Sequence, residues 1–384
     1  MTPHNPRHST RSLRLETIAI HAGREPDPQS GAVADAIQLS TTFARDAQGR
    51  LIGEYLYSRN SNPNRTALEQ TLAELEGGEA ALAYPSGLGA IHALLSLLAA
   101  GDHVLAPEDL YHGTRGLLNE EAGRGLEIGY APLWEPGILE ARIQKNTRLI
   151  FVETPSNPLL NLTDIAALAK VAKAAGAWLA VDNTLASPVL QRPLALGADY
   201  AVHSSTKYFG GHSDVLGGAL IASLAGERIQ RLRDLQIKTG AVPSAFDCWL
   251  IRRGIATLPV RVQAQSSSAL RLAQELHRHP GVERVHYPGL PDHPHHELAK
   301  TQMSAFGGML SIEVRGGESA AARAISRVRL FTRATSLGSV ESLIEHRFAV
   351  EGPDSRTPRN LLRLSIGLEH PDDLIADLEY ALGS

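Results

Sequence analysis

Short apolar runs alternate with segments of helical periodicity between residues 78 and 225, and this alternation limits the folds open to the chain. The runs are too short for helices and are bounded by turn residues, as is typical of buried strands. The predicted strands span residues 80–83, 103–106, 127–130, 149–152, 178–181, 200–202 and 219–222. One predicted helix, at residues 63–76, precedes the strands, and the helices between the strands are predicted at residues 87–100, 113–123, 137–144 and 163–175. We therefore expect an α/β fold with a mostly parallel seven-stranded sheet that helices cover on both faces.

The pattern changes after residue 225. Helices are predicted at 227–239, 245–254 and 260–279, strands at 282–287, 309–314 and 361–366, and a closing helix at 372–382. A chain of 384 residues is long enough for two domains. We expect a large domain over residues 63–255 and a smaller α+β domain over residues 256–384, with the helix at 260–279 as the bridge.

The first 62 residues lack periodicity and are rich in turn residues. A long irregular segment is unusual inside a compact domain. We therefore expect residues 1–62 to form an extended arm that contacts a neighbouring subunit. Residues 1–16 contain no apolar run, which predicts that the chain carries no signal peptide.

Composition narrows the functional classes. The net charge of −4 provides no general attraction for nucleic acid or an acidic membrane surface. Cys248 is the only cysteine, which excludes an intrachain disulfide and fits a reducing, cytoplasmic environment. The most apolar stretch, residues 90–100, is too short to cross a bilayer. The histidine-rich run at 293–296 is interrupted by proline, and we interpret it as a solvated loop rather than a metal site.

Lys207 lies in the most informative stretch of the chain, residues 199–214. The predicted strand at 200–202 is followed by Ser204 and Thr206, then by Lys207 and two glycines. Hydroxyls donate hydrogen bonds to phosphate oxygens, glycines allow close backbone approach, and a desolvated lysine amine can form a Schiff base with an aldehyde. The alternative is an ordinary solvated lysine. Only six of the 37 basic residues are lysine, which favours a specific role.

Other polar residues follow the neighbouring strands. Asp182 ends one apolar strand, where a carboxylate needs a partner such as a protonated ring nitrogen. Tyr111 follows another strand and could stack on a flat cofactor or move a proton, although a half-buried structural tyrosine is an equal alternative. Asn157 lies in a rigid loop with two prolines after a third strand. Because ligands of such sheets bind at the carboxyl ends of strands, these groups should meet.

Two further segments suit a phosphate group. Gly87 and Leu88 open a predicted helix directly after the first strand, and backbone N–H groups at a helix start bind phosphate. Tyr57 and Arg59 alternate in the arm and face one side if the chain is extended. Each signal is weak alone, and an exposed polar loop is the simpler interpretation of Tyr57 and Arg59. A phosphate, an aldehyde and a ring nitrogen are together the features of pyridoxal phosphate.

At this point the chain resembles the Cys/Met-metabolism family of pyridoxal-phosphate enzymes, which contains cystathionine γ-synthases, cystathionine γ- and β-lyases and methionine γ-lyases. The matching segments extend along almost the whole chain in the order of the family: residues 57–63, 75–78, 154–159, 181–184, 203–208, 211–214, 336–343 and 362–367. The resemblance implies a PLP-dependent transferase fold of type I. It also implies homotetramers built from two active dimers, with the arm at the subunit contact.

The resemblance also implies roles for the candidate residues. Lys207 would bind the coenzyme covalently and act as the mobile acid and base, and Tyr111 would stack on the ring and help to move protons. Asp182 would pair with the pyridine nitrogen, and Asn157 would lie near the ring hydroxyl. The implied phosphate ligands are Gly87, Leu88, Ser204 and Thr206, joined by Tyr57 and Arg59 from a neighbouring subunit. Arg363, helped by Ser336, would bind the substrate α-carboxylate.

The chain departs from the family at several positions near these residues. Thr335 replaces a glutamate that many members use for the distal amino group of cystathionine. Gly113 stands where methionine γ-lyases have cysteine, and His112 replaces a common glycine. Arg115 lies one residue before the position at which some members have arginine, and residues 347–352 replace a common tract.

These departures leave the exact reaction open. We expect an enzyme that cleaves or forms C–S bonds of sulfur amino acids, foremost a cystathionine lyase acting by γ- or β-elimination. Cystathionine γ-synthase, which uses an O-acylhomoserine, is the alternative. An aminotransferase and a non-catalytic coenzyme-binding regulator are more remote.

Overall fold

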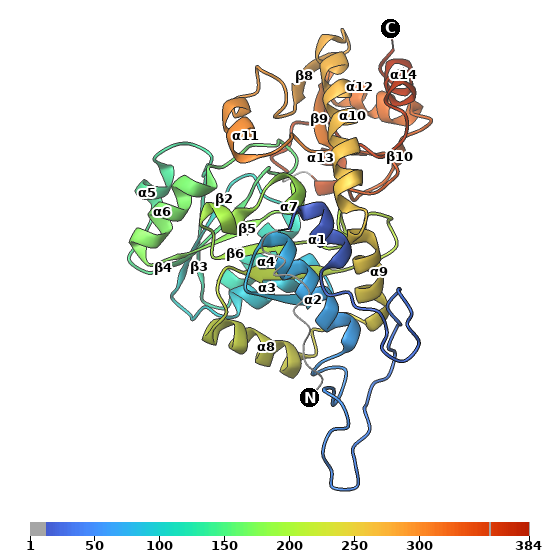
Figure 1. The fold of residues 1–384 in the computed structure, drawn as a ribbon. Helices are drawn as coiled ribbons and strands as arrows, with labels where there is room; N and C mark the ends of the chain where they lie inside the picture. The colour runs from blue at the N-terminus through green and yellow to red at the C-terminus, as the bar shows by residue number, and fades with distance from the viewer. Residues whose placement is uncertain (1–12, 353–354, 384) are drawn as a thin grey trace.

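The computed structural model describes residues 13–352 and 355–383, and it contains two β-sheets with helices packed around each (Figure 1). The larger sheet has strands β1 (Ala80–Tyr84), β2 (His103–Pro107), β3 (Glu127–Ala131), β4 (Thr147–Glu153), β5 (Trp178–Asp182), β6 (Tyr200–His203) and β7 (Gly218–Ala222). Their order is β1-β7-β6-β5-β4-β2-β3, and β7 is antiparallel to both of its neighbours. The predicted mostly parallel seven-stranded sheet is confirmed.

Helices cover both faces of this sheet. Helices α3 (Gly87–Leu95), α4 (His112–Ala122) and α8 (Glu227–Thr239) share one apolar cluster with the strand side chains of one face. Helices α5 (Ile138–Arg142) and α6 (Ile165–Ala175) pack on alternate residues of the same strands, as the two-residue repeat of a strand requires. Helices α2 (Pro63–Glu76) and α9 (Ala245–Ile255) cover the rest of that second face.

Local sequence signals explain where helix α2 begins and ends. The Asn62 side chain accepts a hydrogen bond from the Asn64 backbone, and Pro63 occupies the first helical position. Gly77 ends the helix in the left-handed conformation at φ 74°, where a side chain would be strained. Proline also lies in the first turn of two short helices, α7 (Ser187–Leu190) and the 3₁₀-helix η2 (Pro193–Leu196).

The second sheet lies in the C-terminal part of the chain, at the top of Figure 1. Its order is β10-β11-β12-β9-β8, and its strands are β8 (Val282–His286), β9 (Met309–Val314), β10 (Thr332–Arg333), β11 (Leu343–His346) and β12 (Leu361–Ser365). Its helices are α11 (His296–Gln302), α12 (Gly317–Arg327), α13 (Arg347–Glu351) and α14 (Pro371–Leu382). The long helix α10 (Leu258–Arg278) runs from the larger sheet toward this one, and the domain boundary at residue 255 stays a prediction.

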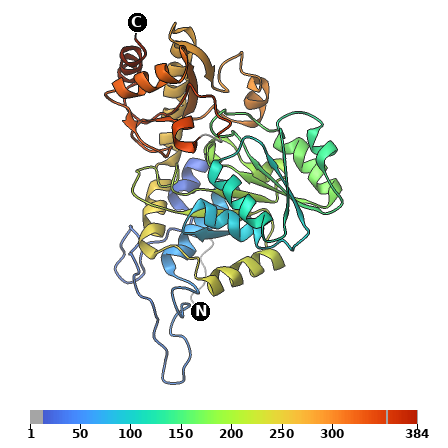
Figure 2. The same cartoon turned by 180° about the vertical axis from the view of Figure 1, so that it is seen from behind.

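The segment expected to form the arm is not irregular throughout its described residues, and its contact with a neighbouring subunit stays a prediction. Helix α1 (Leu15–His21) buries Ile18 and Ala19 against α2 and α10, because its few apolar residues recur at helical spacing. The segment after it forms a long loop that projects from the body of the molecule (Figure 2). The signal-peptide prediction concerns mainly residues 1–12, which lie outside the described residues.

Two other predictions need correction. Helix α3 ends at Leu95 rather than at residue 100, because the backbones of Leu97 and Leu98 donate to carbonyls only three residues back and the chain tightens into turns. The run at 293–296 is not a solvated loop, since His293 is only 8% exposed and burial lowers its pKa to about 4. Within the described part of the chain, no group of three or more His, Cys, Asp or Glu side chains is arranged to hold a metal ion.

Candidate active site

A cavity of about 260 Å³ opens at the carboxyl ends of the central strands of the larger sheet. Its walls come from the starts of α3 and α4, the loops after β4, β5 and β6, and the C-terminal region around β12. The structure brings together nearly all of the predicted site residues here: Gly87, Leu88, Tyr111, Asn157, Asp182, Ser204, Thr206, Lys207, Ser336 and Arg363. Tyr57 and Arg59 lie elsewhere on the same chain.

Lys207 is held at the cavity by the turn that follows β6. The Thr184 hydroxyl accepts from the Ser204 backbone at 2.8 Å, and the Lys207 backbone donates to the Ser204 carbonyl at 3.1 Å. The Lys207 ammonium donates to the Ser336 hydroxyl at 2.8 Å. Burial, and next the positive charge of Arg363, lower the pKa of Lys207 to about 8. A lysine amine that is about half neutral at this pH is suited to nucleophilic and basic chemistry.

Two carboxylates end neighbouring strands beside this amine. Glu153 on β4 pairs in register with Asp182 on β5, and both line the cavity. Asp182 accepts from the Thr184 backbone at 3.0 Å, and Glu153 accepts from the Tyr111 backbone at 2.8 Å. Burial raises the pKa of both groups, and the nearby Asp182 charge raises that of Glu153 further. A cationic ligand group placed here would stabilise the charged form of Asp182.

The start of helix α3 is shaped for close contact. A Cβ added at Gly87 would lie 2.9 Å from the Ser204 Cβ, so glycine is needed for this approach. The Ser86 side chain caps the helix by accepting from the Gly89 backbone at 3.1 Å. The Thr206 hydroxyl donates to the Gly217 carbonyl at 3.2 Å and accepts from the Gly217 backbone N–H at 3.0 Å, so the Thr206 side chain is fixed in place. Backbone N–H groups at such a helix start are donors for an anion.

Arg363 lines the same cavity from strand β12. Its guanidinium donates to the Asn157 amide oxygen at 3.1 Å and to the Ser336 carbonyl at 2.9 Å. It also lies 2.8 Å from a carboxylate oxygen of Glu345. Burial lowers its pKa to about 10, which leaves it cationic at neutral pH. Ser336 has a positive φ of 108°, a strained conformation that aims its hydroxyl at Lys207 and its carbonyl at Arg363.

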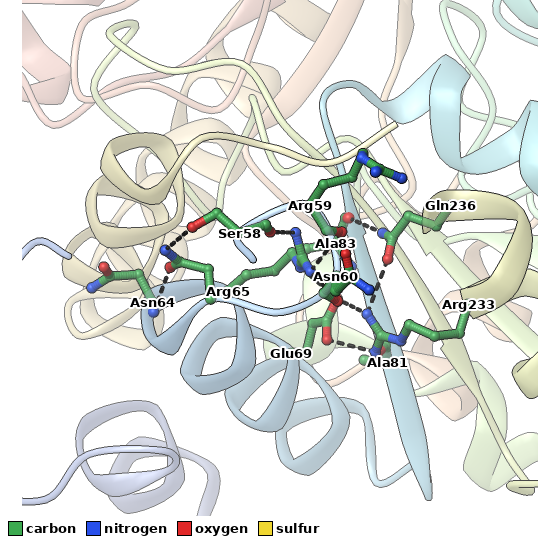
Figure 3. A network of polar contacts seen from close by, with 11 residues as sticks. Ser58, Arg59, Asn60, Asn64, Arg65, Glu69, Ala81, Ala83, Arg233 and Gln236 are labelled. Atoms are coloured by element: carbon green, nitrogen blue, oxygen red, sulfur yellow. Dashed lines mark hydrogen bonds and ion pairs between the residues drawn. The ribbon is translucent and has the colours of Figure 1, made fainter. Parts of the chain in front are cut away.

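Tyr57 and Arg59 line a second pocket of about 430 Å³ together with residues 242–245. A buried polar network holds their segment in place (Figure 3). Arg65 on helix α2 donates to the carbonyls of residues 58, 59 and 60, and Arg59 itself donates to the Ile237 carbonyl at 2.7 Å. The loop that carries Arg59 is therefore ordered within one chain, and the expected contact with a neighbouring cavity stays a prediction.

Some cavity residues were not among the predicted ones. Glu153 ends a buried strand in the same way as Asp182, so the reasoning that selected Asp182 would also have selected it. Thr184 follows Asp182 by two residues and could have been found with it. Arg347 of α13 also lines the cavity and pairs with Glu345 of β11, and no sequence pattern predicted those two elements.

The cavity fits pyridoxal phosphate on the evidence of its own side chains. It presents a partly neutral lysine amine for an aldehyde, a buried carboxylate for a ring nitrogen, and a glycine-lined helix start for a phosphate. Fold and site together define a pyridoxal-phosphate-dependent enzyme of fold type I. The chain belongs to the Cys/Met metabolism PLP-dependent enzyme family, whose model matches residues 16–383.

Individual relatives match over nearly the full chain. The cystathionine gamma-synthase of Mycobacterium tuberculosis H37Rv is 48% identical over 375 residues, which cover 96% of each chain. The cystathionine gamma-lyase of Bacillus subtilis is 42% identical over 381 residues, which cover 96% of this chain and 99% of the relative. The crystal structure of metB from Corynebacterium glutamicum superposes with a TM-score of 0.95 at 43% identity, covering 98% and 99% of the two chains.

The family establishes the general activity. The protein is a pyridoxal-phosphate-dependent transsulfuration enzyme, a carbon–sulfur lyase or a cystathionine synthase, that acts on small amino-acid substrates. None of the helices in the described residues combines the length and apolar character needed to cross a membrane.

Proposed function

We propose that the enzyme is a cystathionine γ-synthase, which replaces the acyloxy group on the γ-carbon of an O-acylhomoserine with the sulfur of cysteine. The observation that carries the proposal is the 48% identity to the synthase of Mycobacterium tuberculosis over 375 residues. The lyases compared, from Bacillus subtilis and Coxiella burnetii, are 42% and 40% identical. This evidence favours the synthase over the lyase that the sequence first suggested.

The residues of the cavity support the proposal by what each can do. Asp182 would hold the ring nitrogen of the coenzyme, and the α3 start with Gly87 would hold the phosphate. Arg363, fixed by Asn157 and Ser336, would bind the substrate α-carboxylate. When bound, pyridoxal phosphate withdraws electrons from the bonds at the substrate Cα.

The amine of Lys207 would serve as the base in this site. It would remove the Cα proton and then move a proton at Cβ, a step that chemistry at the γ-carbon requires. The Ser336 hydroxyl, 2.8 Å from the ammonium, would hold the amine between these positions. Tyr111 would stack on the coenzyme ring and assist proton transfer.

Cystathionine lyase activity is the second candidate, supported by relatives of that name at full coverage. Elimination at the γ-carbon needs the same base and the same proton transfers as replacement. The two reactions differ in whether cysteine enters the cavity as an acceptor or leaves it as a product.

One pair of incubations separates the candidates. The holoenzyme is supplied with O-succinylhomoserine and cysteine, and separately with cystathionine, and the products are identified by mass spectrometry. We expect cystathionine from the first mixture and slow or no cleavage in the second. Rapid release of 2-oxobutyrate with cysteine, or of pyruvate with homocysteine, would instead identify a γ- or a β-lyase. Keto acid formed without ammonia would indicate an aminotransferase.

Lys207→Ala is the control for these incubations. We expect it to lose turnover in every mixture and to lose the visible absorption of lysine-bound coenzyme. Full activity in this variant would contradict the whole assignment.

Assembly and location belong to the same proposal. We infer a homotetramer of two active dimers in which Tyr57 and Arg59 complete the phosphate site of a neighbouring subunit. Exposed apolar side chains in the projecting loop support a subunit contact, for example Val33 and Leu39, each 73% exposed. A free and buried Cys248 is consistent with work in the reducing cytoplasm.

A further inference from the structure

We infer that His112 and Arg347 form a positioning pair that fixes the ring of Tyr111 at the cavity. His112 is the first residue of helix α4, and Arg347 is the first residue of helix α13, far away in the sequence. An Arg347 Nη2 atom lies 3.0 Å from the Nδ1 atom of His112. The inference rests on the role proposed above for Tyr111. It assigns a function to His112 and Arg347, which have no role in the proposed function.

Arg347 is itself held rigidly. Its side chain is fully buried and bonds to Glu345 at 3.0 Å and to Glu351 at 2.7 Å. Glu351 is in turn fixed by hydroxyl donors, of which Thr357 lies at 2.8 Å. Glu345 is shared with Arg363, the proposed ligand of the substrate α-carboxylate. A guanidinium restrained on two sides by carboxylates has little freedom, so it imposes its position on whatever it contacts.

The contact with Arg347 also determines the protonation state and the tautomer of His112. Arginine offers only hydrogen-bond donors, so the Nδ1 atom of His112 must be the acceptor. His112 is therefore neutral and carries its proton on Nε2. Burial, and next the charge of Arg347, lower the pKa of His112, which agrees with a neutral ring. The ring is thus oriented as well as placed.

The Tyr111 ring packs closely against the two residues that follow it. The Tyr111 and His112 ring centroids are 4.6 Å apart at an angle of 65°, an edge-to-face arrangement. A Cβ added at Gly113 would lie 2.5 Å from the Tyr111 Cε1 atom, so the ring also approaches the bare backbone of Gly113. His112 and Gly113 therefore restrict the ring, while Glu153 fixes the Tyr111 backbone.

The consequence is a direct mechanical link between the two parts of the site. The loop around Tyr111 belongs to the larger sheet, whereas Arg347 and Arg363 belong to the C-terminal region. Through His112 and Glu345, the positions of Tyr111 and Arg363 both depend on Arg347. Because His112 is not among the residues that line the cavity, whereas Arg347 is, a substitution of His112 should misplace Tyr111 without removing a group from the cavity wall.

Kinetics of the holoenzyme test this link. His112→Phe keeps an aromatic ring but removes the acceptor, and we expect kcat to fall about tenfold while KM changes little, because orientation is lost rather than binding. His112→Asn keeps an acceptor and should recover part of the loss. Arg347→Met also removes the partner of Glu345 and Glu351, so its loss should be the larger. Adding His112→Phe to Arg347→Met should give no further loss, since the contact that His112→Phe removes is already absent. Fully additive losses would contradict the pair.

A matched arginine provides the control. Arg356 also bridges the two parts of the molecule, lying 3.4 Å from Glu108, but its side chain is 70% exposed. Because exposed ion pairs contribute little, Arg356→Met should leave kcat and the coenzyme spectrum unchanged. A loss as large as that of His112→Phe would show that any contact between the two parts matters, which would overturn the specific pair.

Two spectroscopic measurements do not depend on turnover. Nitrogen NMR of the ¹⁵N-histidine-labelled apoprotein, assigned by comparison with His112→Asn, should show the His112 proton on Nε2. A proton on Nδ1 would overturn the inference even if Arg347 variants fail to fold. In the holoenzyme without substrate, His112→Phe should change the visible circular dichroism of the coenzyme, because Tyr111 stacks on it. An unchanged band together with unchanged kcat would also overturn it.

Discussion

A lysine amine attacks an aldehyde only in its neutral form, so the surroundings of Lys207 determine its reactivity. An ordinary lysine is almost fully protonated at pH 8, whereas burial and the charge of Arg363 lower the pKa of Lys207 to about 8. The same cation that would bind the substrate therefore also prepares the amine. Ser336 connects the two through its hydroxyl and its carbonyl.

This pKa predicts how the apoprotein takes up its coenzyme. Because the pKa is lowered, the neutral amine is scarce below pH 8 and predominates above it. The rate of pyridoxal-phosphate attachment, followed by visible absorption, should rise about tenfold for each pH unit well below pH 8 and level off above it. A rate that keeps rising to pH 10 would mean that Lys207 behaves as an ordinary lysine. Lys207→Ala, measured in the same way, gives the absorption change that does not come from attachment to Lys207.

Thr335 is an exposed residue that lines the cavity. A carboxylate there could meet the distal amino group of cystathionine. We expect Thr335→Glu to lower the dissociation constant for cystathionine, measured by titration of the coenzyme spectrum, about threefold, the size of an exposed ion pair. Thr335→Gln, which matches the size without the charge, should leave this constant unchanged. Equal dissociation constants for cystathionine in both variants would remove Thr335 from distal recognition.

At the scale of elements, the strands and main helices of the larger sheet could be predicted, whereas several elements of the C-terminal region, among them helices α11 and α12, were missed. The strands of the larger sheet are buried and apolar, so their pattern alone located them. Strand β11 was missed because only Leu343 and Ile344 are apolar, while Glu345 is buried by pairing with Arg347 and Arg363. A buried charge looks like a surface residue until its partner, which is distant in sequence, is known.

The same reason limited the prediction of the site. Residues at the ends of apolar strands, such as Asp182 and Lys207, could be predicted because the topology of a parallel sheet gathers them. The pair of His112 and Arg347 could not, since it forms only through the packing of the C-terminal region. Short helices such as α1 carry too few apolar repeats to be distinguished from irregular chain.

The loop of Tyr57 and Arg59 owes its order to helix α2 (Figure 3). Arg65 is 2% exposed and donates to three carbonyls of that loop. Arg65→Met would leave these carbonyls without their donor, and we expect the free energy of unfolding to fall by about 3 kcal/mol. Thermal denaturation of the apoprotein measures the effect, and coenzyme affinity should fall with it.

Arg50 is the matched control for this element. It pairs with Asp46 at 2.8 Å, but its side chain is 75% exposed in the projecting loop. Arg50→Met should leave the melting temperature almost unchanged, because water and salt screen such a pair. Equal destabilisation by the two substitutions would show that the buried carbonyl contacts contribute nothing specific.

The shape of the whole molecule raises the question of what the projecting loop contacts. Ile52 in this loop is 70% exposed, and Val33 and Leu39 are exposed to a similar degree. Apolar side chains gathered on one exposed segment indicate a protein contact. In a symmetric dimer the same loop would reach the partner's site, and the partner's loop would reach this one.

Hybrid dimers test whether the sites are shared. Two differently tagged chains, one with Lys207→Ala and one with Arg59→Ala, are expressed together, and the hybrid is isolated. If Arg59 serves the neighbouring subunit, one site combines both defects and the other is intact, so the hybrid should have about half of the wild-type kcat. A hybrid of the wild-type chain with the Lys207→Ala, Arg59→Ala double variant should then be almost inactive, because each of its sites carries one defect. The reverse result, an inactive first hybrid and a half-active second, would place Arg59 in the site of its own chain.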